Sequence, residues 1–506
     1  MIESSIKIRQ PCSGMLRATL TPILLVVLLL FTGSFVTTLP AADVNRAPNF
    51  VLILVDNLGY GDVACFGSTK HRTPNIDRLA SEGARLTSFY SAAPVCTPAR
   101  ASFLTGCYPR RVGLHVDYNG TQVLMAVSSR GLNPDEHTIA ELLKDHGYAT
   151  ACFGKWHLGD QPPFLPRRHG FDEFFGLPYS EDMGERPATE YRTAVPPLPL
   201  LERETVIEAP TDPSRLTRRF TERAAKFIAN NKDRPFFLYL PHTMPGSTRE
   251  SFASERFKGK SANGTYGDAV EELDWSTGEI LKALKDNGID KQTLVIWTSD
   301  NGPSLRRNVA HGSIEPLQGW GYSTGEGGMR MPFVARWPDQ IPAGTQSDEL
   351  TTAMDLLPTL VKLAGGEVPA DRVIDGHDIW PLLRGKAGAK SPYEAFYFYF
   401  LGQLQAVRSG KWKLYLSLEE KWDRRRWRNE RGDPCELKLV DLDADIREEN
   451  NLASANPEVV KRLMGYAEQA REELGDIGRH GKGQRPAGHY PNPRPLWLNQ
   501  VKSVPE

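Results

Sequence analysis

The chain has 506 residues, enough for one large domain with its own core and a smaller second domain. Its 61 Lys and Arg residues nearly balance 62 Asp and Glu residues, so the charge provides no general attraction to nucleic acid or membranes, and no nucleic-acid partner is expected. A charged fraction of 24% and a hydrophobic fraction of 40% are typical of a globular protein and argue against disorder.

The N-terminus has the order of a secretory signal. Basic residues up to Arg17 precede an apolar run at 23–31, and the small residues Ala41 and Ala42 follow. The sequence therefore predicts a signal peptide over residues 1–42 and an exported protein, periplasmic or extracellular. The apolar run is shorter than the roughly 20 residues that span a bilayer, and an uncleaved membrane anchor is the alternative.

The next part of the chain, residues 43–388, alternates apolar runs with helical patterns. Continuous apolar runs predict buried strands at 49–55, 149–153, 236–240, 294–298 and 333–337. Helical patterns between them predict helices at 75–83, 138–146, 216–230 and 265–287. This alternation predicts an α/β domain with a large, mostly parallel sheet flanked by helices.

The chain changes character from about residue 389. Strand patterns at 395–401 and 412–416 and an amphipathic helix at 457–473 predict a smaller α+β domain over residues 389–478. Residues 479–506 are rich in Pro, Gly and basic residues, which predicts an extended tail.

Two strands of the predicted sheet end in a carboxylate followed by an amide. Asp56-Asn57 follows the strand at 49–55, and Asp300-Asn301 follows the strand at 294–298. Ligands of parallel sheets bind at the carboxyl ends of the strands, and oxygen ligands of this kind suit calcium or magnesium. Either pair alone is equally well explained as a turn, but two pairs in one sheet favour a metal site.

Other polar residues follow the remaining strands. Lys155 and His157 are two apart, so in an extended chain they face the same side and place a fixed cation beside a group that titrates near neutral pH. His242 follows the strand at 236–240 at the same predicted edge. Unrelated surface or structural residues are the alternative interpretation.

Cys96 opens the run Cys96-Thr97-Pro98-Ala99-Arg100. Thr97 fits an N-cap and Pro98 a first helical position, which predicts a helix over 99–105 with Cys96 at its N-terminus. That end of a helix favours anions, and Arg100 adds a permanent charge, so the site suits sulfate or phosphate. A bare thiolate nucleophile, as in cysteine phosphatases, is the alternative, but those loops separate cysteine and arginine by more than the three residues found here.

In combination these motifs resemble the type I, formylglycine-dependent sulfatases, an arylsulfatase-like family of the alkaline phosphatase superfamily. The resemblance extends over nearly all of the chain after the signal and includes the segments 102–106, 154–157, 326–330 and 355–360. It implies hydrolysis of a carbohydrate or aryl sulfate to an alcohol and inorganic sulfate. It also implies that a formylglycine-generating enzyme or equivalent maturase converts Cys96 to formylglycine, whose hydrate is the nucleophile.

The resemblance implies a divalent ion, most often calcium with magnesium as the alternative, bound by Asp56, Asn57, Cys96 as formylglycine, Asp300 and Asn301.

The resemblance also implies the catalytic roles. Asp300 would help to deprotonate the hydrate, and Arg100 and Lys155 would hold the hydrate and the developing charge. His242 would protonate the leaving alcohol, and His157 would take the second hydroxyl proton so that sulfate is expelled.

Two positions depart from the family pattern. Asn57 stands where a second aspartate is usual, and Gly321 stands where a lysine usually contacts the sulfate. We expect the two changes to compensate, because one carboxylate and one cation are lost together. His242 then becomes the main acid, with His311 or His115 as side chains that could assist it. Side chains that could line the substrate pocket are His115, His311, Trp320 and Tyr322. The basic stretch 421–428, with its interleaved aromatic residues, could bind a sulfated polysaccharide, but an exposed loop is the favoured interpretation.

Two other functions remain open from the sequence. One is a phosphodiesterase or phosphonate hydrolase on the same fold. The other is a non-catalytic binder of sulfated glycans, in which the missing lysine marks lost activity.

Overall fold

The computed structural model describes residues 46–184, 195–248, 250–306, 309–310, 312–418 and 436–496. The predicted signal peptide, His311, the basic stretch 421–428 and the end of the predicted tail lie outside these residues. Within the described part of the chain, every helix is too short or too polar to cross a membrane.

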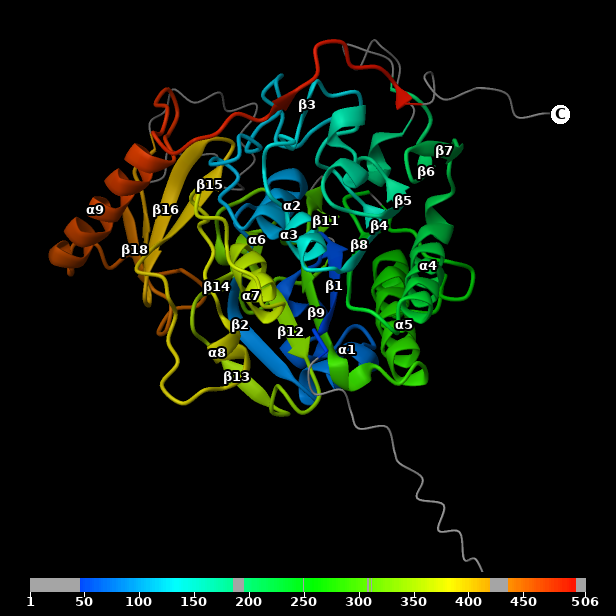
Figure 1. Ribbon diagram of the computed structural model, residues 1–506. Coiled ribbons are helices and arrows are strands. Elements are labelled where there is room, and N and C mark those ends of the chain that lie inside the picture. Colours follow the sequence, from blue (N-terminus) through cyan, green and yellow to red (C-terminus); the bar gives the residue numbers. More distant parts are fainter. Residues whose placement is uncertain are drawn as a thin grey trace, which may run out of the picture. The chain divides into compact units, whose positions relative to one another are not determined.

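An 11-stranded sheet forms the centre of the large domain (Figure 1). Its neighbouring strands β9 (Thr293–Ser299), β1 (Asn49–Asp56), β8 (Phe236–Pro245), β4 (Ala149–Lys155) and β5 (Glu173–Leu177) all run parallel. Parallel strands end at one edge, so their carboxyl ends lie together. The predicted mostly parallel α/β sheet is confirmed.

The two sides of the sheet are antiparallel extensions of this parallel centre. Next to β9, β12 (Arg330–Arg336) runs antiparallel to both β9 and β2 (Ala84–Tyr90). The short strands β13 (Thr345–Ser347) and β14 (Thr351–Thr352) pair with β2. At the other side, β6 (Leu200–Glu202) and β7 (Thr205–Glu208) add antiparallel strands after β5.

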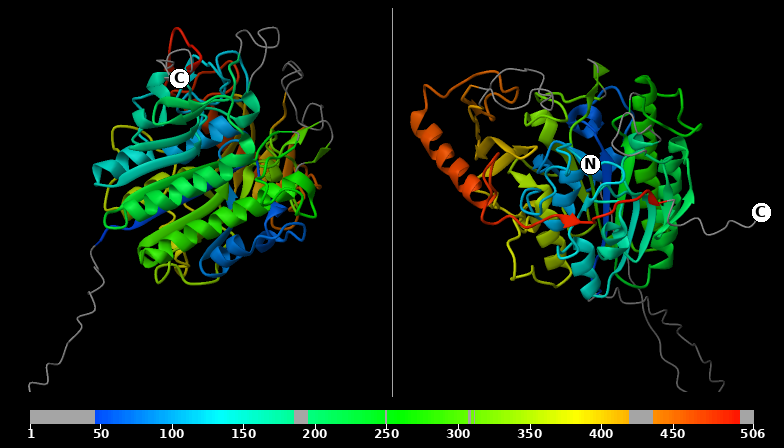
Figure 2. Two further views of the ribbon diagram at one scale, coloured as in Figure 1. Left: turned by 90° about the vertical axis from the view of Figure 1, so that its right-hand side faces the viewer. Right: turned by 90° about the horizontal axis from the view of Figure 1, so that it is seen from above.

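Helices cover both faces of the sheet because the apolar side chains of each central strand alternate between two cores. In β1, Phe50, Leu52 and Leu54 belong to one core, and Val51, Ile53 and Val55 belong to the other. The first core is covered by α2 (Cys96–Thr105), α3 (Ile139–Asp145) and α7 (Leu356–Leu363). The second is covered by α1 (Pro74–Ser81), α4 (Leu216–Asn230) and α5 (Gly264–Asp286) (Figure 2).

The smaller domain is an antiparallel sheet with one helix. The sheet contains β15 (Phe396–Phe400), β16 (Gln403–Ser409), β17 (Trp412–Tyr415) and β18 (Lys438–Asp441), and α9 (Pro457–Glu473) packs on it. This agrees with the predicted α+β domain.

The chain after α9 returns to the large domain, as the right-hand view in Figure 2 shows from above. There β19 (Gly488–His489) pairs with β3 (Arg130–Gly131), and Arg485 donates to Glu136 over 2.7 Å. Leu496 is buried and belongs to the first of the two cores. The predicted extended tail is therefore packed on the large domain as far as this residue.

The remaining elements are short: β10 (Leu305–Arg306), β11 (Val309–Ala310), α6 (Glu326–Met329) and α8 (Trp380–Leu383). Of these, α6 connects the two domains. Lys413 of β17 donates to Glu326 of α6 over 2.9 Å, and both side chains are fully buried. The Glu448 carboxylate lies 2.9 Å from the same ammonium group.

Replacing Lys413 with Met should destabilise the protein. The substitution removes the cation between Glu326 and Glu448 and leaves Arg330 as the ion-pair partner of Glu326. Breaking a buried ion pair costs about 3 kcal/mol. Chemical denaturation measures the loss of unfolding free energy. The matched control is Lys411→Met, because Lys411 lies two residues away but pairs with Asp441 at the surface, where the effect should be small. Equal losses in the two variants would contradict the role of the buried pair.

Candidate active site

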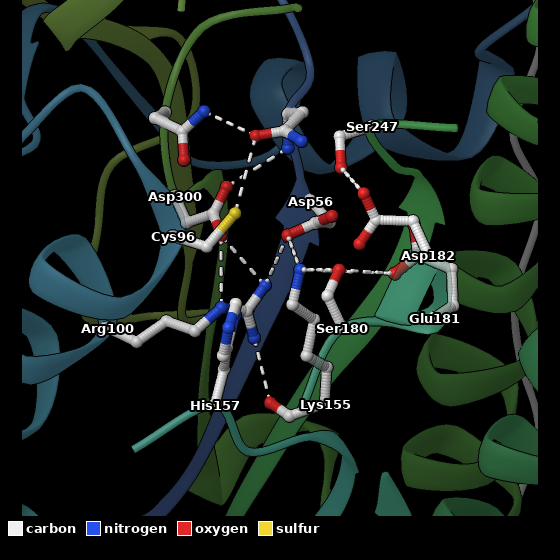
Figure 3. Close-up of polar contacts among 12 residues, drawn as sticks. Asp56, Cys96, Arg100, Lys155, His157, Ser180, Glu181, Asp182, Ser247 and Asp300 are labelled. Carbon is white, nitrogen blue, oxygen red and sulfur yellow. Dashed lines mark hydrogen bonds and ion pairs between the residues drawn. The ribbon is translucent and has the colours of Figure 1, made fainter. Parts of the chain in front are cut away.

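The candidate site lies at the carboxyl edge of the parallel strands, where α2 begins (Figure 3). Asp56 ends β1, Lys155 ends β4, and Asp300 follows β9 directly. Most of the residues predicted from the sequence lie together here and are buried, namely Asp56, Asn57, Cys96, Arg100, Lys155, His157, Asp300 and Asn301.

Arg100 joins the two carboxylates of the site. Its Nη2 donates to Asp56 Oδ1 and to Asp300 Oδ2, both over 2.8 Å, and its Nε donates to Asp300 Oδ2 over 3.0 Å. Its Nη1 donates to the backbone carbonyl of Lys155 over 2.8 Å. The Lys155 ammonium donates to Asp56 Oδ1 over 2.7 Å, so Asp56 lies between two cations.

These contacts give the two carboxylates different pKa values. Burial raises the pKa of Asp56, but Lys155 and Arg100 outweigh burial and hold this pKa at about 2. Burial and the neighbouring Asp56 raise the pKa of Asp300 to about 7, against the effect of Arg100. Asp56 is therefore an anion at neutral pH, whereas Asp300 is poised to gain or lose a proton.

The donor atoms fit a divalent cation. Ligand atoms of Asp56, Cys96 and Asp300 lie within 4.8 Å of one another. Asp56 Oδ2 and Asn301 Oδ1 are buried without a hydrogen-bond partner, and Asn57 Oδ1 faces the Asn301 amide and lies 3.6 Å from Cys96 Sγ. Unpaired buried oxygens are costly, and a cation bound among them would satisfy them.

Cys96 lies at the N-terminus of α2, as predicted, but it is the first helical residue and Thr97 is not the N-cap. Val95 is the N-cap residue, and the Thr97 hydroxyl instead donates to the His157 carbonyl over 3.0 Å. Burial, followed by the charge of Asp56, raises the pKa of the Cys96 thiol well above its ordinary value of 9.0. The thiol therefore stays protonated, which does not fit a thiolate nucleophile.

His157 is held as a neutral base. Its Nε2 lies 3.0 Å from the Leu124 carbonyl, and a carbonyl only accepts, so Nε2 carries the proton. Nδ1 then has a free lone pair and is buried without a partner. Burial, followed by the charges of Lys155 and Arg100, lowers the pKa of His157 well below its ordinary value of 6.5.

His242 does not join this group. It points to the helices on the other face of the sheet, where its Nε2 lies 3.1 Å from Ser276 Oγ of α5 and its ring packs beside Phe220 of α4. Its position therefore argues against the predicted role as proton donor, and burial lowers its pKa to about 3. Strand alternation turns the next residue, Thr243, to the face of the site, and the Thr243 hydroxyl is buried without a partner.

Gly321 lies where no side chain fits. A Cβ at this position would be 2.5 Å from the Gly302 carbonyl oxygen, and the Gly321 amide donates to the Pro303 carbonyl over 2.9 Å. The lysine usual in the family is therefore excluded by close packing against the residues that follow Asn301. Its neighbours Trp320 and Tyr322 are half-buried.

His115, predicted near the substrate, lies beside the N-terminal end of α2. It lines a small recess together with Val95, Pro98, Arg110 and Gly402, the last of which belongs to the smaller domain. Burial, followed by the charge of Arg110, lowers the pKa of His115 to about 3.

The sequence interpretation missed Ser180 and Glu181, which follow β5. Ser180 Oγ accepts from the Lys155 ammonium over 2.9 Å, and Glu181 Oε2 lies 3.0 Å from Ser180 Oγ. The signal was weaker than at β1 and β9, because Pro178 and Tyr179 separate the apolar run of β5 from Ser180 and Glu181.

The fold and this site define a hydrolase of the alkaline phosphatase-like class. The chain matches the sulfatase family over residues 48–366 and the C-terminal region of N-sulphoglucosamine sulphohydrolase over residues 323–472. It therefore belongs to the sulfatase family.

Characterised sulfatases are similar over most of the chain. Steryl-sulfatase of Mus musculus is 38% identical over 450 residues, which covers 74% of this chain and 72% of the relative. Arylsulfatase A of Homo sapiens is 40% identical over 392 residues, which covers 74% of this chain and 75% of the relative. The protein is thus an enzyme that hydrolyses sulfate esters.

Solved structures agree with this fold. A structure from glycosaminoglycan metabolism in Bacteroides thetaiotaomicron has a TM-score of 0.73 at 27% identity and covers 84% of this chain and 99% of that one. A Pseudoalteromonas sulfatase has a TM-score of 0.71 at 28% identity, with 84% and 91% covered. A third structure, in complex with a neocarrahexaose, has a TM-score of 0.70 at 27% identity, with 91% and 98% covered.

Replacing His242 with Gln should leave turnover of an aryl sulfate within about threefold of wild type, because a side chain facing Ser276 takes no part in the chemistry. Lys155→Met is the comparison and should lower kcat/KM at least ~100-fold, since it removes a cation from the reaction centre. Steady-state kinetics on the two variants measure both effects. A loss in His242→Gln as large as that in Lys155→Met would place His242 in the chemistry after all.

Proposed function

We propose that this sulfatase hydrolyses the sulfate ester of a carbohydrate or an aryl alcohol with formylglycine, formed from Cys96, as its nucleophile. The observation that carries the proposal is the buried cluster around Arg100, which places Cys96 at a helix start beside two carboxylates and a lysine. A thiol with a raised pKa is a poor nucleophile in this place, whereas an aldehyde hydrate supplies a hydroxyl for attack and a second one for release of sulfate.

A calcium ion would be held by Asp56, Asn57, Asp300, Asn301 and residue 96. When bound, it would offset the charge of the sulfate and lower the pKa of the nucleophile. The partnerless oxygens Asp56 Oδ2 and Asn301 Oδ1 support this assignment. A set of several protein oxygens suits calcium better than magnesium, which keeps most of its waters.

The chain's own residues supply positioning and proton transfer. Arg100 and Lys155 are fixed by Asp56 and Asp300, so their charges are in place before the substrate arrives. His157 presents Nδ1 as a base, because the Leu124 carbonyl holds the proton on Nε2. This tautomer suits removal of a hydroxyl proton from the nucleophile, the step that expels sulfate.

The proposed substrate class is supported by the relatives. Relatives include arylsulfatase A and N-acetylgalactosamine-6-sulfatase, and a similar structure was solved with a neocarrahexaose.

Maturation and export complete the proposal. Cys96 is buried in the folded protein. A formylglycine-generating enzyme or an equivalent maturase would therefore have to act before the large domain has folded. The secretory signal predicted for residues 1–42 would then send the protein to the periplasm or the exterior.

The matured protein should hydrolyse 4-nitrophenyl sulfate far faster than bis(4-nitrophenyl) phosphate, and Cys96→Ala should lower sulfate turnover at least ~1000-fold. Mass spectrometry of the tryptic peptide 86–100 should show an aldehyde in place of the thiol. A preference for the phosphate diester, or an active preparation that carries only a thiol at position 96, would contradict the proposal.

Removing the metal should both inactivate and destabilise the enzyme. Chelation should lower the thermal midpoint by at least about 2 °C, and added calcium should restore it, since an ion bound only to the folded state stabilises that state. Calcium should give no such shift in Asp300→Asn. Asp339→Asn, at an exposed carboxylate paired with Lys291, should respond like the wild type. A shift retained in Asp300→Asn would place the ion elsewhere.

A further inference from the structure

Cleavage of an unactivated sulfate ester requires a proton for the leaving alcohol, and the described residues offer few donors. His242 faces the opposite side of the sheet, and Gly321 carries no side chain. The His157 proton is held by the Leu124 carbonyl, and the Lys155 ammonium has a raised pKa beside Asp56.

We propose that Glu181 supplies this proton through the hydroxyl of Ser180, which contacts both Glu181 and Lys155. The inference rests on the sulfatase function proposed above. Glu181 Oε2 lies 3.0 Å from Ser180 Oγ, and Ser180 Oγ lies 2.9 Å from the Lys155 ammonium, which itself contacts Asp56. Figure 3 shows these groups as one line from the carboxylate of Asp56 to that of Glu181.

The Glu181 side chain is buried and fixed by packing at the margin of the site. Its Oε1 has no hydrogen-bond partner. That oxygen lies against Gly246, where a Cβ would approach it to 2.5 Å, and the Gly246 amide donates to the Asp56 carbonyl over 3.0 Å. Glu181 therefore packs between the ends of β5 and β8, at the margin of the site.

The surroundings of Glu181 favour its protonated form. Among the described residues, the charged groups that face it are Lys155 on β4, Asp56 on β1 and the adjacent Asp182. Of the described residues after β8, Gly246 lies against Glu181 and Ser247 bonds to Asp182. Burial is the largest effect and raises the pKa of Glu181 to about 7, with Lys155 acting against it and Asp56 adding to it. A carboxylic acid with such a pKa can hold a proton near neutral pH and release it during turnover.

The proposed step balances as follows. As the bond between sulfur and the alcohol oxygen breaks, that oxygen takes the Ser180 hydroxyl proton, and Ser180 takes the Glu181 proton. The sulfuryl group passes to the attacking oxygen, Glu181 becomes a carboxylate 3.9 Å from the Lys155 ammonium, and water returns its proton before the next turnover. Ser180 ends the step unchanged.

Glu181→Gln keeps the shape of the side chain and removes the proton, so its effect should depend on the leaving group. We expect kcat/KM for 4-nitrophenyl sulfate to stay within about threefold of wild type, because that phenolate leaves without protonation. For phenyl sulfate, a poorer leaving group, kcat/KM should fall about 100-fold. The ratio between the two substrates does not depend on the active fraction, so partial misfolding cannot imitate the result.

Ser180→Ala should produce the same leaving-group dependence, and the double variant should be little worse than either single one, because both interrupt one relay. Ser247→Ala is the matched control, since this nearby hydroxyl bonds to Asp182 instead and should leave the ratio unchanged. In the wild type, kcat/KM for phenyl sulfate should fall as the pH rises past the pKa of Glu181, and this limb should vanish in Glu181→Gln.

Equal losses on both substrates in Glu181→Gln, or an unchanged pH profile, would overturn the relay and leave Glu181 as a residue that only positions Lys155. Wild-type turnover of 4-nitrophenyl sulfate tests the sulfatase function separately, so the failure of one proposal is distinguishable from the failure of the other.

Discussion

The contact on which this structure most depends is the buried guanidinium of Arg100 between Asp56 and Asp300. It joins α2 to the ends of β1 and β9, segments that lie far apart in the sequence. A buried ion pair is weak evidence for stability, but removing one partner is costly because the other charge is left uncompensated. The same atoms therefore hold the edge of the sheet together and fix the geometry of the site.

The cations also decide which carboxylate oxygens are left for a metal. Asp56 uses Oδ1 for Arg100 and Lys155 and leaves Oδ2 without a partner. Asp300 accepts from Arg100 at Oδ2 and from the backbone N–H of Asn57 at Oδ1. Each side chain is thus oriented before any ion binds, which lowers the cost of organising the ligands.

The smaller domain supports the site from behind. Lys413 donates to the Thr324 carbonyl as well as to Glu326, and Gln405 bonds the Thr324 hydroxyl. These contacts hold the segment before α6, whose Gly321 packs on the residues after Asn301. Part of the catalytic edge therefore depends on charges contributed by the antiparallel sheet.

The central fold and the clustering of Asp56, Cys96 and Asp300 were predictable from the sequence because apolar runs locate buried strands and parallel strands end at one edge. His242 was misplaced for a specific reason. The apolar run predicted a strand ending at residue 240, whereas β8 continues to Pro245, so His242 lies inside the strand and alternation turns it to the other face. Strand ends are set by pairing with neighbours, which a single apolar run does not reveal.

The two departures from the family pattern, Asn57 and Gly321, both affect the net charge of the site. The described site balances two carboxylates, Asp56 and Asp300, against two cations, Arg100 and Lys155. A carboxylate at position 57 would add a third negative charge to the site, and close packing at Gly321 leaves no room for the lysine usual in the family. An amide at position 57 keeps an oxygen ligand beside Cys96 without adding charge. The packing around Gly321 thus accounts for the missing lysine, whereas the compensation between positions 57 and 321 stays a prediction from the sequence.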